Sequence, residues 1–578
     1  MRKILLFVLL ILSVSFLSAA GSQKVYQMTD SVWQLTDKLC RMNGVLGPVP
    51  VSPTSEAEIM VALNRLTYSS LDEYGRNLYD RTIALMKEKT GWSYESSGIT
   101  IDPSLKINPQ LYGFNNRKNT YFDEFSLQFK DRDQFLILDM EASVMDRVYA
   151  YFQYSLMDNP RSFSIGADGK QTDGDFFQNY SNFSALLNYS MNDELVGLLA
   201  GNKGNENTNI FVHHPIKAGL SIGNGYMNFV IGRFRQAFGG GVTGNMIIGD
   251  NFAYQELMKF SLYTDVFSYH LSLTHYDNVE NSTGFMFAGT HQNRTIQRFD
   301  FALFDKLRLA VNIGAHISSP AVFDWRMIMP MMIVHNWDNN SEDIELTEGD
   351  EINNILGLEA EWIINKTFSL SAQIAIDQMQ FIGEPTAIPD AYGALVNMKM
   401  VLPLEKGISE SYVEAVYTNP YLYLNYKEDG NGNPVYTLDH IAGYYWKQIG
   451  KGEINYLGHS FGPDTIALAA GTTFDAFDNW KLSGDFLFKV HGEKGIERAY
   501  WPKQNQSHTG VDNQNKLITP TGTPEFTFQI GISGEYSLSS SVRLNASLTD
   551  RWQWNYHNEP GLEKHSMQGS FGVRLCLF

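Results

Sequence analysis

The chain has 578 residues, a hydrophobic content of 43% and a formal net charge of −19. This acidic balance excludes the basic surface that nucleic-acid binding requires, so no nucleic-acid partner is expected. Beyond residue 22 no apolar stretch reaches the ~18 residues that a membrane-spanning helix needs, which excludes a helical membrane protein.

The first twenty residues have the pattern of a secretion signal. Arg2 and Lys3 precede an apolar run over residues 4–16, and small residues at positions 18–20 form a cleavage site. No cysteine follows that site, so lipoprotein attachment is not expected. The run is short for a spanning helix, although an uncleaved anchor is the alternative. We therefore predict that residues 1–20 are a cleaved signal peptide.

Residues 24–92 show helical periodicity. Ser55 and Glu58 form a capping box, and apolar residues at helical spacing follow them. A second pair of this kind, Ser70 and Glu73, opens another amphipathic segment. Short helices over so few residues bury too little surface to be stable alone. We predict a small helical plug over residues 24–92 that docks against the rest of the chain.

From about residue 105 to residue 578 the chain repeats segments in which apolar and polar residues alternate. At 307–317 every odd-numbered residue is apolar, whereas Arg308, Asn312 and His316 lie between them. Side chains alternate between the two faces of a strand, so such a strand has one apolar and one polar face. At ~10 residues for each spanning strand, the region holds about 16 to 20 strands.

This pattern behind a secretion signal predicts an all-β transmembrane barrel of antiparallel strands in the outer membrane. The apolar face of each strand would meet outer-membrane lipid, and the polar face would line a lumen. The competing architecture is a soluble β-sandwich or solenoid, which also alternates. The absence of any domain boundary within the strand region favours the barrel.

Cys40 and Cys576 are the two cysteines, and they lie at opposite ends of the chain. The sequence leaves open a disulfide between them or two separate thiols, and it has no metal-ligand spacing. Residues 429–440 begin like a calcium loop, but Pro434 and His440 occupy the positions of the required glycine and glutamate. We predict no metal and no cofactor.

Residues 458–462 match the G-x-S-x-G pattern, with Ser460 at the nucleophile position. A nucleophile elbow needs a strand before it and a helix after it. Residues 465–471 have the pattern of a strand or loop, so a glycine-bearing turn is favoured. We predict no catalytic residue, and an esterase centred on Ser460 is the least favoured hypothesis.

Tyr444, Tyr445 and Trp446 form an aromatic cluster in a loop-like context. Exposed aromatic rings can stack on sugar rings, because the negative face of the ring attracts positive C–H edges. The alternative is a place in the aromatic girdle at the membrane interface. We retain all three as candidate ligand contacts.

Arg233 and Arg235 precede three consecutive glycines at positions 239–241. Such glycines indicate a tight bend or a close approach of the backbone to a neighbour. The arginines could bind anionic groups of a ligand. Alternatively, they are charged side chains that line the lumen and bind no ligand, as is common in barrels.

Read together, these segments resemble the Wzi family of outer-membrane capsule-assembly proteins. The resemblance covers most of the mature chain and rests on the helical region 31–85, the glycine-rich stretch 232–251, the strand pair 353–377 and the segment 457–464. The tryptophan-rich Gly-Pro-Gly core of the family signature is replaced here by Ala-Phe-Gly-Gly-Gly at 237–241. Asn251 ends the glycine-rich stretch and joins the candidate ligand contacts.

The resemblance implies a barrel of about eighteen strands with a periplasmic helical plug. It also implies a non-enzymatic, lectin-like protein that binds surface or capsular polysaccharide and anchors it at the cell surface. The polysaccharide export machinery is a further expected partner. The alternative function is a porin-like diffusion channel, whose lumen polarity would come from Arg308, His316, Gln373, Asp377 and Arg543.

Overall fold

The computed structural model describes residues 22–89, 92–115, 136–156, 163–165, 171–173, 183–185, 217–252, 254–276, 291–319, 323–331, 351–378, 390–428, 434–437, 442–447, 451–476, 479–495 and 517–577. The expected signal peptide at 1–20 lies outside these residues. No described helix is long and apolar enough to cross a membrane.

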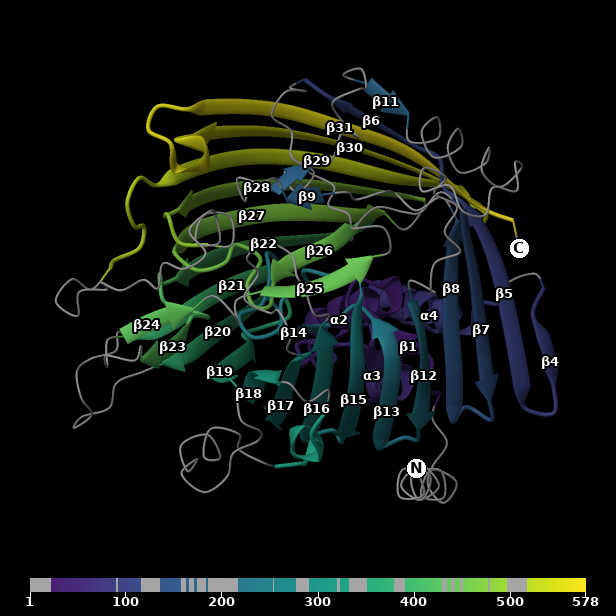
Figure 1. Cartoon of the computed structure of the whole chain (residues 1–578). Helices are drawn as coiled ribbons and strands as arrows, with labels where there is room; N and C mark the ends of the chain where they lie inside the picture. The colour runs from purple at the N-terminus through teal and green to yellow at the C-terminus, as the bar shows by residue number, and fades with distance from the viewer. Residues whose placement is uncertain are drawn as a thin grey trace, which may run out of the picture.

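Twenty-one of the described strands form one sheet. Three of them, β4 (Tyr94–Ser96), β6 (Gln110–Phe114) and β11 (Phe183–Ala185), are short additions, and the other eighteen form a closed antiparallel ring (Figure 1). The ring strands are β5 (Ile99–Ile107), β7 (Leu136–Val144), β8 (Val148–Leu156), β12 (Lys217–Gly223), β13 (Met227–Phe234), β15 (Gln255–Tyr263), β16 (Phe267–Tyr276), β17 (His291–Leu303), β18 (Leu307–Ser319), β19 (Glu351–Ile363), β20 (Phe368–Gln378), β21 (Ala391–Leu404), β22 (Gly407–Thr418), β27 (Thr465–Ala476), β28 (Trp480–His491), β29 (Glu525–Ser539), β30 (Val542–Trp554) and β31 (Glu563–Cys576).

The ring closes where the last strand meets the first. Leu575 and Cys576 of β31 pair with Ile107 and Lys106 of β5, and the pairing continues between β31 and β6. A closed ring leaves no unpaired sheet edge, as a barrel in lipid requires. The predicted barrel of about eighteen antiparallel strands is confirmed, and the soluble sandwich is excluded.

The outer face of the ring is apolar. In β19, for example, Leu356 and Leu358 are 36% and 40% exposed, whereas Ile355 on the opposite face is 7% exposed. Large apolar side chains are exposed in the same way on other ring strands: Leu309, Val396, Met398, Val413, Leu468, Leu482, Ile530, Ile532 and Leu548. An apolar surface of this extent, on strands that close without an edge, is typical of a barrel that contacts lipid.

Connections at one end of the barrel are short. Residues 145–147, 304–306 and 405–406 each join two successive strands, whereas residues 419–464 connect β22 with β27 at the other end. In barrels of this class the short turns face the periplasm. The main chain of Leu46 donates a hydrogen bond to the carbonyl of Asp305 in one short turn, at 2.8 Å. The N-terminal segment therefore reaches the mouth of the barrel at the end with the short turns.

The plug consists of α2 (Ser31–Met42), α3 (Glu56–Leu63) and α4 (Glu73–Lys87), which lie within the curve of the strands (Figure 1). Ser55 caps α3 as predicted, accepting from the Glu58 N–H at 3.3 Å. The cap of α4 is Asp72, which accepts from the Gly75 N–H at 2.7 Å, and not Ser70. Ser70 instead ends a short 3-10 turn two residues before the cap, and its hydroxyl donates to the Thr67 carbonyl.

The three helices share a small core with the barrel wall. Leu39 of α2, Leu63 of α3 and Leu78 of α4 pack together with Val401 and Ile408, which come from β21 and β22. Docking thus supplies the apolar burial that a short bundle lacks by itself.

The strand region starts at Tyr94, ahead of the predicted residue 105. Pro103 interrupts the sequence pattern there because proline cannot donate a ladder hydrogen bond. In the structure Pro103 lies within β5, opposite Met140 of β7.

Candidate functional site

Charged side chains of the barrel wall hold the plug. Arg308 of β18 donates to the carbonyls of Gly47 and Pro48 at 2.6 and 3.1 Å and to Glu361 at 2.5 Å. Glu361 also accepts from Arg41 of α2 at 2.9 Å. Charge-assisted hydrogen bonds of this kind are the strong ones. The inward arginine that sequence reasoning assigned to a channel lumen is therefore a plug anchor.

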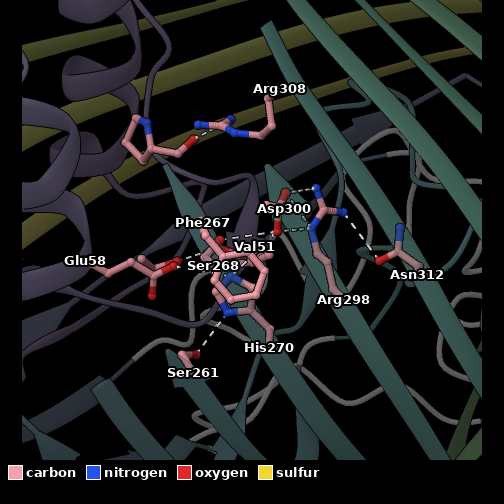
Figure 2. A network of polar contacts seen from close by, with 12 residues as sticks. Val51, Glu58, Ser261, Phe267, Ser268, His270, Arg298, Asp300, Arg308 and Asn312 are labelled. Carbon is pink, nitrogen blue, oxygen red and sulfur yellow. Dashed lines mark hydrogen bonds and ion pairs between the residues drawn. The ribbon is translucent and has the colours of Figure 1, made fainter. Parts of the chain in front are cut away.

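A second cluster of polar and charged side chains lies between the plug and the wall and surrounds Glu58 of α3 (Figure 2). His270 Nε2 lies 3.6 Å from Glu58 and 3.8 Å from Asp300, and Arg298 binds Asp300 at 2.8 Å. All four side chains are buried. Burial raises the pKa of Glu58 to about 7, and the negative Asp300 adds to the effect against opposing contributions from Lys259 and Arg308.

The glycine-rich segment after β13 turns into the barrel and joins the plug. β14 (Ala237–Phe238) pairs antiparallel with β2 (Val51–Ser52), and the Gly239 N–H donates to the Pro50 carbonyl at 2.7 Å. Fully buried side chains of both segments form one core with the wall strands: Val51, Phe238, Met246, Ile355, Ala375 and Leu395. Within the described residues, the middle of the lumen is thus filled by chain and not open.

Two of the three consecutive glycines are required by close packing, and the third is not. A Cβ on Gly239, whose φ is +120°, would lie 2.4 Å from Gln373 Nε2, and one on Gly241 would lie 1.9 Å from the Gly244 carbonyl oxygen. A Cβ on Gly240 would meet nothing within 4 Å. Gly240 therefore borders open space.

That open space is a cavity of about 450 Å³ between the plug and the inner wall. Its walls come from α2, from residues 239–245 and from the inward faces of β21, β22, β27 and β28. Its lining includes the charged side chains of Lys38, Arg235, Asp250, Lys399, Glu410 and Lys481. The volume is within the ~300–1,000 Å³ range of small-molecule sites.

Most charges in this cavity are neutralised by a partner. Arg235 forms a bidentate pair with Asp250, and Lys38 lies 3.2 Å from Glu410. Lys399 and Lys481 make no ion pair within 4.0 Å among the described residues. The lining therefore presents two unpaired ammonium groups.

The structure separates the sequence candidates. Arg235 and Asn251 line the cavity, whereas Arg233 does not and binds Glu256 at 2.9 Å. The Asn251 amide donates to the carbonyls of Tyr456 and Gly458 at 2.8 and 2.7 Å. Asn251 therefore fixes the 456–458 loop to the glycine-rich segment.

Tyr444, Tyr445 and Trp446 lie in a strand and not in a loop. They belong to β25 (Ala442–Lys447), which pairs with β26 (Lys451–Tyr456) in a hairpin apart from the barrel sheet (Figure 1). The short strand was missed because glycines and polar residues flank it. The side chains of these three residues are outside the described part of the structure.

The G-x-S-x-G stretch forms a turn, as expected. Ser460 Oγ donates to the Thr243 carbonyl, and β27 begins at Thr465, where a nucleophile elbow would need a helix. His459 Nε2 lies 3.2 Å from the Thr243 hydroxyl, and burial lowers the pKa of His459 to about 4. Both side chains thus tie this turn to the glycine-rich segment.

Among the other inward residues, Gln373 contacts the filled interior, whereas His316 and Arg543 contact neighbouring strands of the wall. Gln373 accepts from the Met246 N–H at 2.9 Å, and His316 hydrogen-bonds Gln292 at 2.7 Å. Arg543 pairs with Glu535 at 3.3 Å at a more exposed position of the wall. These side chains point inward as predicted, and each of them contacts another part of the protein.

Both cysteines are free thiols, which resolves the question that the sequence left open. Cys40 is fully buried in α2, and Cys576 is partly exposed at the end of β31. Within the described ranges, no three His, Cys, Asp or Glu side chains are grouped so as to hold a metal ion.

Sequence reasoning missed Lys399, Lys481 and Glu410 as parts of one site. All three stand at polar positions of alternating strands, which is the only signal they carry. Many other residues share that signal. The pattern of the strands also does not predict which plug residues complete the cavity.

No family model matches the chain, and no curated protein matches it. Among solved structures it is similar to Wzi of Escherichia coli, described as an outer-membrane protein involved in group 1 capsule assembly and a carbohydrate-binding β-barrel. The TM-score is 0.55 at 13% identity, over 96% of this chain and 99% of Wzi.

Two barrels of Acinetobacter baumannii align less well. The outer-membrane channel DcaP gives a TM-score of 0.35 at 9% identity, over 84% of this chain and 99% of its own. OccAB4 gives 0.37 at 9% identity, over 83% and 98%. Scores this low carry no argument about function. The Wzi match shows a common fold, and the chain is a closed eighteen-stranded barrel that resembles the Wzi barrel.

Proposed function

We propose that this protein lies in the outer membrane and, without catalysis, binds exported surface polysaccharide and anchors it to the cell. The observation that carries the proposal is the filled lumen. The plug and the glycine-rich segment occupy the interior and leave a polar cavity of about 450 Å³ between them. The carbohydrate binding described for the similar Wzi barrel supports the same chemistry here.

Anchoring of a polymer does not require a tight site. Each sugar unit would make a few hydrogen bonds and ion contacts, and repeated units along the chain would raise the overall avidity. The polysaccharide export machinery would deliver the polymer, and outer-membrane lipid would hold the apolar face of the barrel.

The alternative, a porin-like channel, is favoured only by the polar inward faces of the strands. Arg308 and Gln373 would line such a channel, yet both bind chain segments that fill the lumen. Planar-bilayer recordings distinguish the two functions. An anchoring barrel is expected to show no steady conductance, and large steady conductance would support the channel.

Deletion of the gene tests anchoring directly. Polysaccharide attached to cells is measured against polysaccharide shed into the medium, in the deletion strain and after complementation. We expect attached polysaccharide to fall on deletion and to return with the wild-type chain. An unchanged ratio in the deletion strain would refute the anchoring function.

A further inference from the structure

Building on the proposed function, we infer that the cavity beside α2 binds acidic sugar units of the polysaccharide, with Lys399 and Lys481 holding successive anionic groups. The ligand is thus an anionic oligosaccharide segment, and carboxylate or phosphate on the sugar supplies the charge.

Two positive charges in the cavity have no ion-pair partner among the described residues. Arg235 and Lys38 are neutralised by Asp250 and Glu410, whereas Lys399 and Lys481 have no such partner among the described residues. Unpaired ammonium groups inside a barrel are costly unless water or an anion solvates them. Asp475 and Glu535, the acidic neighbours of Lys481 on the adjacent strands, form ion pairs with Arg81 and Arg543 instead.

Asp37, another residue of the cavity wall, forms its ion pair with Arg41 and not with either lysine. Its carboxylate binds Arg41 at 2.8 Å, and the positive charges of Arg41 and Lys399 hold its pKa below the ordinary value despite burial. Asp37 is therefore already paired, and it stays charged. The lysines remain available to an external anion.

The two lysines are too far apart on the wall to share one small ion. Lys399 is on β21 and Lys481 on β28, with β22 and β27 between them in the ring. Three strand spacings separate them by about 14 Å around the wall. The pairing register places Lys399 at the level of Asp485, four residues from Lys481 along β28. One small ion cannot contact both ammonium groups, whereas a short run of acidic sugars can.

The backbone of Gly240 is open to the cavity. Its N–H makes no hydrogen bond to the described part of the chain, and a Cβ there would meet nothing within 4 Å. Gly240 lines the cavity together with both lysines. A sugar hydroxyl can therefore approach the main chain at this point, where a side chain would exclude it.

The test measures binding of trigalacturonate, maltotriose and inorganic phosphate to the detergent-purified full-length barrel. Trigalacturonate and maltotriose have the same number of sugars, so their comparison isolates the carboxylates. We expect the wild-type chain to prefer trigalacturonate over both other probes. A Lys399→Gln/Lys481→Gln variant is expected to bind it at least about tenfold more weakly, because each charged hydrogen bond contributes ~1.5–3 kcal/mol.

Two controls keep the result interpretable. Lys406→Gln removes an exposed turn lysine that does not line the cavity and is expected to change nothing. Gly240→Leu fills the space without removing a charge and is expected to abolish binding, whereas Gly240→Ala retains most of it. Heat-modifiable migration in gels verifies that each variant is a folded barrel.

The same variants are then placed in the polysaccharide-retention assay. Loss of retention in the double-lysine and Gly240→Leu strains supports the inference. Two results would overturn the cavity assignment and leave the anchoring function intact. One is retention by these variants at the wild-type level. The other is a wild-type chain that binds maltotriose or phosphate as tightly as trigalacturonate. Absence of retention by the wild-type chain would instead defeat the proposed function.

Discussion

Protonation of Glu58 is expected to control how firmly the plug is docked. Glu58 is 3% exposed, and its pKa rises from an ordinary 4.5 to about 7 because of burial beside Asp300. An acid with a higher pKa in the folded state holds its proton more tightly when folded. Its stabilising contribution is therefore complete below pH 4.5 and is lost as the pH rises through about 7.

The size of the effect follows from the difference between these two pKa values. It corresponds to about 3 kcal/mol, at ~1.4 kcal/mol for each pH unit. Hydrogen exchange of peptides from α3 measures the opening free energy of the plug from pH 5 to pH 8. We expect that energy to fall by about 2.5 kcal/mol across this range in the wild-type chain, because part of the effect already lies below pH 5.

Glu58→Gln is the matched variant, because glutamine has the shape of the protonated acid and cannot ionise. Its opening energy is expected to be independent of pH. Glu73→Gln, which changes an exposed acid of α4, serves as the control and should retain the wild-type slope. An equal slope in the Glu58→Gln chain, or a plug that becomes more stable at high pH, would refute this reasoning.

Three further predictions concern the interior. Arg308→Met removes the hydrogen bonds to the plug carbonyls and is expected to lower the free energy of plug unfolding in urea by about 3–5 kcal/mol; a loss under 1 kcal/mol would contradict an anchoring role. Gly239→Ala should destabilise the barrel by about 1–3 kcal/mol in thermal unfolding, while Gly240→Ala should be neutral, and equal effects would show that the close approach to Gln373 is unimportant. Cys40 should resist a thiol reagent at pH 8 and react only in urea, because burial raises its pKa to about 12; rapid labelling of the folded chain would show that α2 opens readily.

The barrel could be predicted from the sequence because one rule with period two governs every strand. The alternation predicted at 307–317 is present in β18, where Arg308 and Asn312 are buried on the inward face and Leu309 is exposed on the outward face. The capping box of Ser55 likewise predicted the start of α3, since a cap depends only on neighbouring residues. Local patterns of this kind were sufficient for the architecture.

The candidate site depends on contacts that no local pattern encodes. Arg233 and Arg235 have a similar sequence context, yet only Arg235 lines the cavity. Arg233 pairs with Glu256 of β15, whereas Arg235 pairs with Asp250 of the glycine-rich segment, and this difference depends on the path of the chain after β13. Lys399 and Lys481 are distinguished from other inward lysines only by the absence of a partner, which becomes visible once the whole ring is assembled.

The connection between the plug and the wall also determines the order in which the protein can assemble. The Arg41 side chain contacts Ser369, 328 positions later in the chain, and Arg81 contacts Asp475, 394 positions later. The N-terminal segment comes first in the chain, but its docking surface exists only after the strands that carry Ser369 and Asp475 have formed. High contact order slows folding. We therefore expect docking of this segment to be a late step of assembly.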